Sequence, residues 1–101
     1  MSKKPNFTYV DLFAGCGGLS LGLEREGGEL LLAVERSDMA AETFFHNLVS
    51  PIGTKDFWKS YVSKSVDEQV KNRVLVKELS SLLDSKSALG AIADQKPDVV
   101  V

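Results

Sequence analysis

The feature that most constrains the fold is an apolar run that breaks into glycines and then resumes with helical spacing, at residues 9–20. Its sequence is Tyr-Val-Asp-Leu-Phe-Ala-Gly-Cys-Gly-Gly-Leu-Ser. A continuous apolar run is typical of a parallel strand that is buried on both faces. Glycines permit a tight turn and let a ligand approach the backbone closely. The stretch therefore predicts a strand, a tight turn and a helix whose free N–H groups point at the turn.

A turn of this kind is suited to hold a nucleotide or a nucleotide-like molecule. The match to a dinucleotide fingerprint is incomplete, because Ser20 occupies the position of the third glycine. Glu35 ends the next apolar run, where a carboxylate can accept hydrogen bonds from both hydroxyls of a ribose. The structural alternatives are a glycine turn that binds nothing and a carboxylate that only ends a strand.

The remaining hydrophobic pattern predicts an α/β fold, in which an open parallel sheet is flanked by helices and joined by right-handed crossovers. Strands are expected at residues 7–12, 29–35, 73–77 and 99–101. Helices are expected from residue 19 to 26, from 37 or 38 to about 49, and at 78–84 and 87–94. Over residues 74–76 a helical pattern competes with the strand, and we favour the strand.

Residues 51–72 have a weaker pattern, and we interpret them as an insertion with short helices. Phe57, Trp58 and Tyr61 are spaced like one helical turn. We expect them to form a satellite cluster on the domain rather than a platform for stacking bases, since no basic and aromatic interleaving accompanies them. His46, the only histidine, is expected on the surface near a helix C-terminus, where the helix dipole favours its charged form.

Length and composition limit the classes of protein to which this chain can belong. With 101 residues and 44% hydrophobic residues, we expect one globular domain. The net charge of −2 argues against a basic nucleic-acid surface over the whole chain, although residues 55–73 carry a net charge of +2. The polar start at residues 1–6 and the lack of a long apolar run predict no signal peptide and no membrane span. We therefore expect a cytoplasmic or nuclear protein that is not secreted.

Residues 11–24, with the sequence Asp-Leu-Phe-Ala-Gly-Cys-Gly-Gly-Leu-Ser-Leu-Gly-Leu-Glu, resemble the first signature of the DNA (cytosine-5) methyltransferases. Residues 33–35 and the helix that follows resemble the second signature, and residues 97–101 resemble the strand that leads into the Pro-Cys loop of that family. The resemblance implies a Rossmann-like S-adenosylmethionine-dependent methyltransferase fold. Residues 1–101 would then form the amino-terminal part of the domain, with a partial, truncated sheet.

The resemblance also implies a site for S-adenosylmethionine. Residues 13–19, from Phe13 to Leu19, would surround the methionine part, Glu35 would bind the ribose, and Arg36 would stack on the adenine ring. The implied cofactor-binding residues are Phe13, Ala14, Gly15, Cys16, Gly17, Gly18, Leu19, Glu35 and Arg36. The acidic residue with which the family reads the adenine amino group has no clear counterpart near residues 77–79, and no metal site is predicted.

In that family a cysteine thiolate attacks C6 of a flipped cytosine, which activates C5 toward the methyl group of the cofactor. We expect this cysteine beyond Val101, and we interpret Cys16 as a small turn residue that lines the cofactor. No residue of this chain is therefore predicted to be catalytic. We expect a fragment that is inactive alone and that needs the remainder of the chain or a complementary subunit, with DNA contacted through those parts. The alternatives are a nicotinamide- or flavin-dinucleotide-binding oxidoreductase module and a non-enzymatic interaction lobe.

Overall fold

A four-stranded parallel sheet forms the centre of the protein. The computed structural model describes residues 4–101, so residues 1–3 of the polar start discussed above lie outside the described residues. The strands are β1 (Phe7–Asp11), β2 (Gly28–Val34), β3 (Val74–Leu75) and β4 (Val99–Val100), in the order β3-β2-β1-β4. All three strand pairs are parallel, which confirms the predicted α/β fold with an open parallel sheet.

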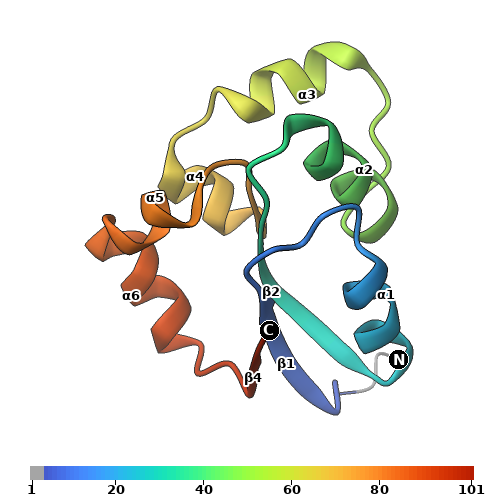
Figure 1. The fold of residues 1–101 in the computed structure, drawn as a ribbon, viewed down its shortest axis with the longest axis vertical. Coiled ribbons are helices and arrows are strands. Elements are labelled where there is room, and N and C mark those ends of the chain that lie inside the picture. The colour runs from blue at the N-terminus through green and yellow to red at the C-terminus, as the bar shows by residue number, and fades with distance from the viewer. Residues whose placement is uncertain (1–3) are drawn as a thin grey trace.

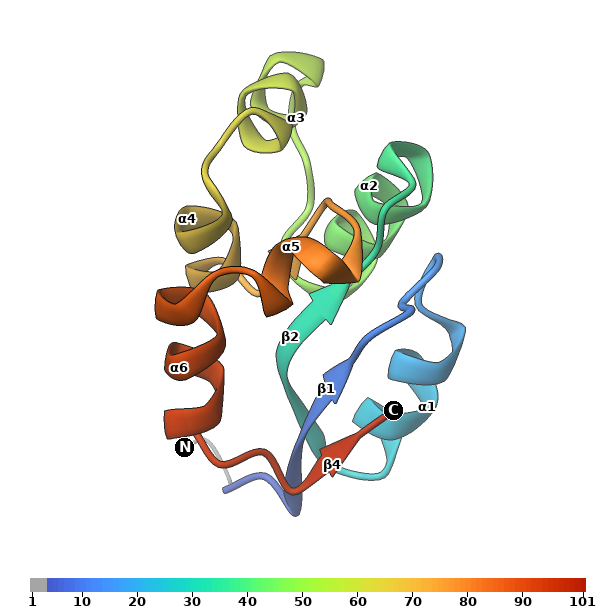
Figure 2. The same cartoon turned by 60° about the vertical axis from the view of Figure 1, so that its left-hand side comes forward.

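Helices cover both faces of this sheet, as Figures 1 and 2 show. On one side lie α1 (Gly18–Arg25) and α2 (Asp38–Leu48), and on the other lie α4 (Val66–Lys71), α5 (Leu79–Leu83) and α6 (Lys86–Asp94). The remaining helix, α3 (Lys55–Val62), packs beside α2 at the top of Figure 1. Within residues 4–101, no helix combines the length and the apolar character that a membrane crossing requires.

The predicted elements are all present, although the third and fourth strands are only two residues long. Residues 74 and 75 form a strand and not part of a helix, because Val74 and Leu75 pair with Ala33 and Val34 of β2. Both residues of β3 are fully buried. Burial against a central strand therefore decides between two local patterns that fit the sequence equally well.

The central strand β2 is apolar throughout because it contributes to a hydrophobic cluster on each face of the sheet. Leu30 and Ala33 pack in the cluster under α1 and α2, whereas Leu31, Leu32 and Val34 pack in the cluster under α4, α5 and α6. The pairing with β1 shifts by one residue between Leu30 and Leu32, which indicates a bulge.

Two of the three aromatic residues of α3, Trp58 and Tyr61, belong to the main core, so the prediction of a satellite cluster was wrong for them, whereas Phe57 is exposed. Trp58 and Tyr61 are buried in the same cluster as Phe44 and Phe45 of α2. The rings of Trp58 and Tyr61 stack with centroids 5.2 Å apart and planes 10° apart. The three rings of α3 all pack against Phe45 of α2, so α3 covers part of the apolar face of that helix.

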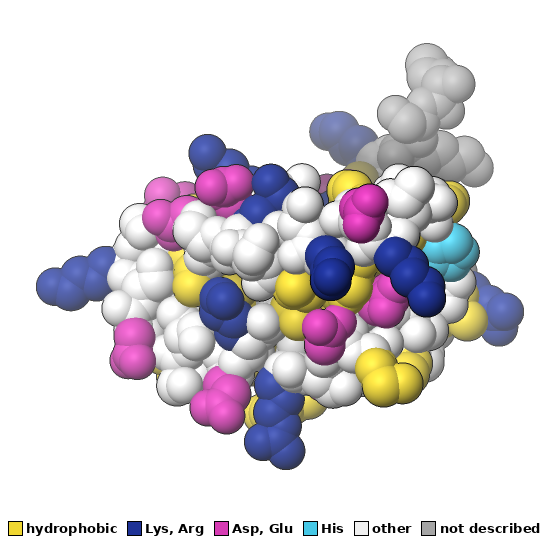
Figure 3. Space-filling model, turned by 90° about the horizontal axis from the view of Figure 1, so that it is seen from above, with side chains coloured by type: hydrophobic (Ala, Val, Ile, Leu, Met, Phe, Trp, Pro, Cys, Tyr) yellow, Lys and Arg dark blue, Asp and Glu magenta, His cyan; other side chains and the backbone are white. Residues whose placement is uncertain are grey.

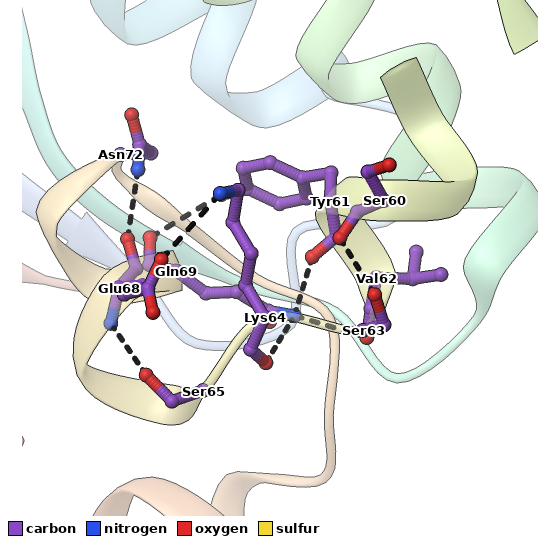
Figure 4. A network of polar contacts seen from close by, with 9 residues as sticks. All are labelled: Ser60, Tyr61, Val62, Ser63, Lys64, Ser65, Glu68, Gln69 and Asn72. Carbon is purple, nitrogen blue, oxygen red and sulfur yellow. Dashed lines mark hydrogen bonds and ion pairs between the residues drawn. The ribbon is translucent and has the colours of Figure 1, made fainter. Parts of the chain in front are cut away.

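Gln69 joins the end of α3 to β3, in the network drawn in Figure 4. Its side chain is fully buried, and its amide group donates to the carbonyl oxygens of Tyr61, Val62 and Lys64 at 3.0–3.3 Å. Its amide oxygen accepts a hydrogen bond of 2.8 Å from the N–H of Val76. One side chain thereby satisfies backbone groups within the segment 51–72 and just after β3.

Tyr61 supports the same connection through its hydroxyl group, which donates to the carbonyl oxygens of Gln69 and Val74. Burial raises the pKa of Tyr61 well above its ordinary value, so the hydroxyl keeps its proton and remains a donor.

His46 lies exposed in the last turn of α2, as predicted, but it makes a hydrogen bond that the sequence did not suggest. Its Nδ1 atom accepts from the N–H of Ile52 at 2.8 Å. His46 therefore terminates α2 by fixing the chain that follows it.

Replacing Gln69 tests how much this buried network contributes to stability. Q69L leaves the N–H of Val76 and the carbonyl groups of Val62 and Lys64 without the Gln69 amide, whereas the carbonyl oxygen of Tyr61 still accepts from the N–H of Lys64. We expect the free energy of unfolding to fall by about 3 kcal/mol. The measurement is urea denaturation followed by circular dichroism. E68Q, which alters only the exposed Lys64–Glu68 ion pair one residue away, serves as the control and should change stability by less than about 0.5 kcal/mol.

Candidate functional site

The carboxyl ends of the parallel strands meet at one edge of the sheet, and the loops that follow β1, β2 and β3 gather there (Figure 2). Ligands of open α/β sheets bind beyond this edge, near the position where the strand order reverses. Here the order reverses at β1, which has β2 on one side and β4 on the other. Figure 3 views the molecule from above and shows hydrophobic side chains between charged ones on this side.

The glycine turn after β1 has the backbone conformation that its sequence predicts. Gly15 and Gly17 adopt positive φ angles of 55° and 104°, and Gly17 is the N-cap residue of α1. The N–H of Ala14 donates to the carbonyl oxygen of Val34 at 3.0 Å, so the turn is attached to the end of β2. A side chain at Gly17 would meet Leu48 and Phe44 of α2, whereas the space beside Gly15 is open.

Asp11 and Ser20 stabilise this turn through hydrogen bonds of the Asp11 carboxylate, a role that the sequence reasoning missed. Asp11 is only 2% exposed, and its carboxylate accepts from the N–H of Phe13 at 3.3 Å and from the hydroxyl of Ser20 at 3.0 Å. The signal was present in the sequence: an acidic residue ends an apolar strand, and a serine stands where a dinucleotide fingerprint has glycine. A buried carboxylate needs such partners, and these two connect both ends of the turn.

The carboxylate of Glu35 also stabilises this turn through hydrogen bonds. One carboxylate oxygen accepts from the N–H of Gly15 at 2.9 Å, and the other accepts from the N–H of Ser37 at 2.7 Å. Because each carboxylate oxygen has a second lone pair and the side chain is half-buried, Glu35 can still accept hydrogen bonds from a ligand. The predicted acceptor is therefore fixed against the predicted turn.

A cleft of about 500 Å³ opens beside this carboxylate. It collects residues from the loops after three strands: Leu12, Phe13, Val34, Glu35, Arg36, Lys77, Glu78, Leu79 and Ser80. The side chain of Phe13 is 78% exposed, which leaves an aromatic face available at the rim. Glu78 precedes α5 and makes no capping hydrogen bond with its side chain. Residues 77–79, in which the sequence shows no clear counterpart of the acidic residue that reads the adenine amino group, therefore line the cleft.

The structure brings the predicted site residues together only in part. Phe13, Glu35 and Arg36 line the cleft, and Gly15 is hydrogen-bonded to Glu35. Ala14 and Gly17 are buried behind the turn, while Cys16, Gly18 and Leu19 are exposed and do not line this cleft. A Cβ atom at Gly15 or Gly18 would meet no neighbour, so a ligand has room to approach the backbone there.

These residues suit an adenosine-like ligand, since a carboxylate, an aromatic ring and a guanidinium group surround one cleft. In residues 4–101, no three His, Cys, Asp or Glu side chains are placed to hold a metal ion. Burial raises the pKa of Tyr9, whose hydroxyl donates to the carbonyl oxygen of Ser20, so this group acts as a structural donor.

Comparison with known proteins agrees with this geometry. The family model described as "C-5 cytosine-specific DNA methylase" matches residues 7–71. The chain is similar to the type II methyltransferase M.HgiGI of Herpetosiphon aurantiacus, with 45% identity over 47 residues, and to M.HindV of Haemophilus influenzae, with 51% over 43 residues. It is also similar to DNA (cytosine-5)-methyltransferase 1 of Mus musculus, with 41% over 56 residues.

These alignments cover 46%, 43% and 54% of this chain, but only 37%, 14% and 4% of the respective relatives. The chain therefore spans a minor part of the length of each of these proteins. No solved structure gave a significant match. The comparisons favour the methyltransferase prediction over the dinucleotide-binding alternative.

The two positive-φ glycines should respond differently to substitution. G15A adds a methyl group in open space and should cost about 1 kcal/mol, which is the penalty of a left-handed backbone. G17A adds a larger backbone strain, because its φ of 104° lies outside the left-handed region that residues with a side chain adopt, and it adds a clash with Leu48 and a Cβ 3.1 Å from Phe44, so its cost should reach about 3 kcal/mol. Urea denaturation of both variants measures the difference, and equal costs would contradict the packing of Gly17 on α2.

Proposed function

Since this chain belongs to the C-5 cytosine-specific DNA methylase family, we propose that it forms the S-adenosylmethionine-binding part of a DNA cytosine-5 methyltransferase. The observation that carries the proposal is the position of Glu35. Its carboxylate is held against the glycine turn by the N–H of Gly15, and it also lines the cleft. An acceptor in this place is suited to the two hydroxyl groups of a ribose.

Each wall of the cleft has a separate part in this proposal. Glu35 accepts hydrogen bonds from the ribose, and the Phe13 ring and the Arg36 guanidinium contact the adenine. Glu78 is available to accept a hydrogen bond from the adenine amino group. The turn from Ala14 to Leu19, which includes Cys16, receives the methionine part. When bound, S-adenosylmethionine supplies a methyl group that its sulfonium activates for transfer.

The activity of the whole protein is methyl transfer to C5 of cytosine in DNA. Cys16, exposed in the turn, is not assigned as the nucleophile, because it does not line the cleft. We propose that the nucleophile and the DNA contacts come from other parts of the methyltransferase or from a complementary subunit. Residues 51–72 are an insertion in this scheme, and the protein acts in the cytoplasm or the nucleus.

Exchange of Glu35 for glutamine tests the site. E35Q replaces one acceptor oxygen by an N–H₂ group, which cannot accept from a backbone N–H or a ribose hydroxyl. We expect the affinity for S-adenosylhomocysteine, the demethylated cofactor, to fall about tenfold, since a hydrogen bond to a charged group is lost. Isothermal titration calorimetry with the folded chain measures this change.

E29Q is the matched control, because Glu29 is an exposed glutamate at the opposite end of β2. It should bind S-adenosylhomocysteine as the wild-type chain does. No binding to the folded wild-type chain, or equal binding by E35Q, would contradict the proposed function. Binding of NADH in place of S-adenosylhomocysteine would support the oxidoreductase alternative.

A further inference from the structure

We propose that Trp58 is a positioning residue for the cofactor cleft and that it acts through Asp38. The inference rests on the proposed function and assigns a task to the segment 51–72. The indole N–H of Trp58 donates to Oδ1 of Asp38, twenty residues earlier in the chain. Asp38 is the first residue of α2, the helix that follows Glu35 and Arg36.

The indole ring is held firmly enough to serve as an anchor. Trp58 is only 5% exposed, and its ring stacks on Tyr61. The ring of Phe45, on α2 itself, lies 5.8 Å from it between centroids, at an angle of 58°. Tyr61 is fixed in turn by its hydrogen bonds to the backbone of Gln69 and Val74. A residue packed in this way has one orientation, so its N–H has a fixed direction.

From Asp38 the connection to the cleft is short. The preceding residue, Ser37, donates its N–H to one oxygen of Glu35, and the other oxygen receives the N–H of Gly15. Backbone hydrogen bonds hold the two ends of the chain between β2 and α2: the N–H of Glu35 donates to the carbonyl oxygen of Leu75 at 3.0 Å, and the N–H of Ala41 donates to that of Ser37 at 2.9 Å. Between these ends, the Ser37 hydroxyl accepts from the N–H of Ala40 at a long 3.4 Å. Ser37 and Asp38 are exposed residues. The Trp58 indole is therefore a buried anchor for an otherwise exposed turn that sets the position of Glu35.

A second contact of the same segment supports this interpretation. On the opposite wall of the cleft, Gln69 accepts from the N–H of Val76, immediately before Lys77 and Glu78. The segment 51–72 therefore makes hydrogen bonds to residues beside both walls, to the side chain of Asp38 and to the backbone of Val76, without lining the cleft. This arrangement is expected of a segment that supports the walls of the cleft. An insertion that contacts the ligand would line the cleft instead.

The test compares four single variants and one double variant of the full chain. W58F keeps an aromatic ring and removes the N–H, and D38A removes the acceptor, whereas D38N keeps an acceptor oxygen. T54A is the stability control: it removes the Thr54 hydroxyl that caps α3 but leaves Trp58 and Asp38 in place. Two properties are measured, the affinity for S-adenosylhomocysteine by calorimetry and hydrogen exchange at the Gly15 amide by NMR.

We expect W58F and D38A to weaken binding about fivefold and to accelerate Gly15 exchange, as the loss of one hydrogen bond predicts. The double variant W58F/D38A should be no worse than either single one, because both remove the same contact. D38N and T54A should bind within about twofold of wild type. In the wild-type chain, fluorescence of Trp58, the only tryptophan, should also change on binding.

Two results overturn the inference: unchanged Gly15 exchange in W58F, or a T54A variant that loses affinity as much as W58F does. The first shows that no coupling reaches the glycine turn, and the second shows that α3 acts only through stability. The exchange measurement needs no ligand. Absence of binding to the wild-type chain together with faster Gly15 exchange in W58F would therefore overturn the proposed function and leave the coupling in place.

Discussion

The bridge that Glu35 makes between Gly15 and Ser37 is the interaction on which the candidate site depends. Two loops, one after β1 and one after β2, each direct a backbone N–H at the same carboxylate. A turn rich in glycine has many accessible conformations, and its ordering costs entropy. A charged acceptor bound to both loops stabilises one conformation, because hydrogen bonds to a carboxylate are stronger than those to a neutral group. The cleft is therefore shaped by the protein's own contacts before any ligand enters.

Asp11 and Glu35 are carboxylates at the ends of neighbouring strands, and they differ in exposure and in role. Asp11 is buried, and its two partners, Phe13 and Ser20, both belong to the turn and the helix that follows it. Glu35 is half-buried and lines the cleft, so it retains access to a ligand. A carboxylate whose partners lie inside the protein stabilises the fold, whereas one at the rim of a cleft is accessible to a ligand. The difference in exposure separates the two roles more clearly than the residue type does.

Local pattern was sufficient to predict the sheet, the glycine turn and the place of Glu35. These features follow from periodicity and from glycine spacing within about twenty residues. The contacts of residues 51–72 could not be predicted in this way. Trp58 and Tyr61 gave only the spacing of one helical turn, and that spacing does not say which surface they cover. Gln69 showed no signal at all, because a buried glutamine is distinguished from a solvated one only by the carbonyl groups that surround it.

The segment 51–72 also explains how a sheet with two very short strands keeps its cleft in shape. β3 pairs with β2 at only two positions, so pairing alone holds the chain that leads to Lys77 and Glu78 weakly. Gln69 adds a hydrogen bond to Val76, just beyond β3, and Tyr61 adds one to Val74 within it. On the other wall, Trp58 holds Asp38 in the same manner. Side chains from two short helices thus compensate for missing backbone pairing. The geometry of the cleft consequently depends on residues that never reach it.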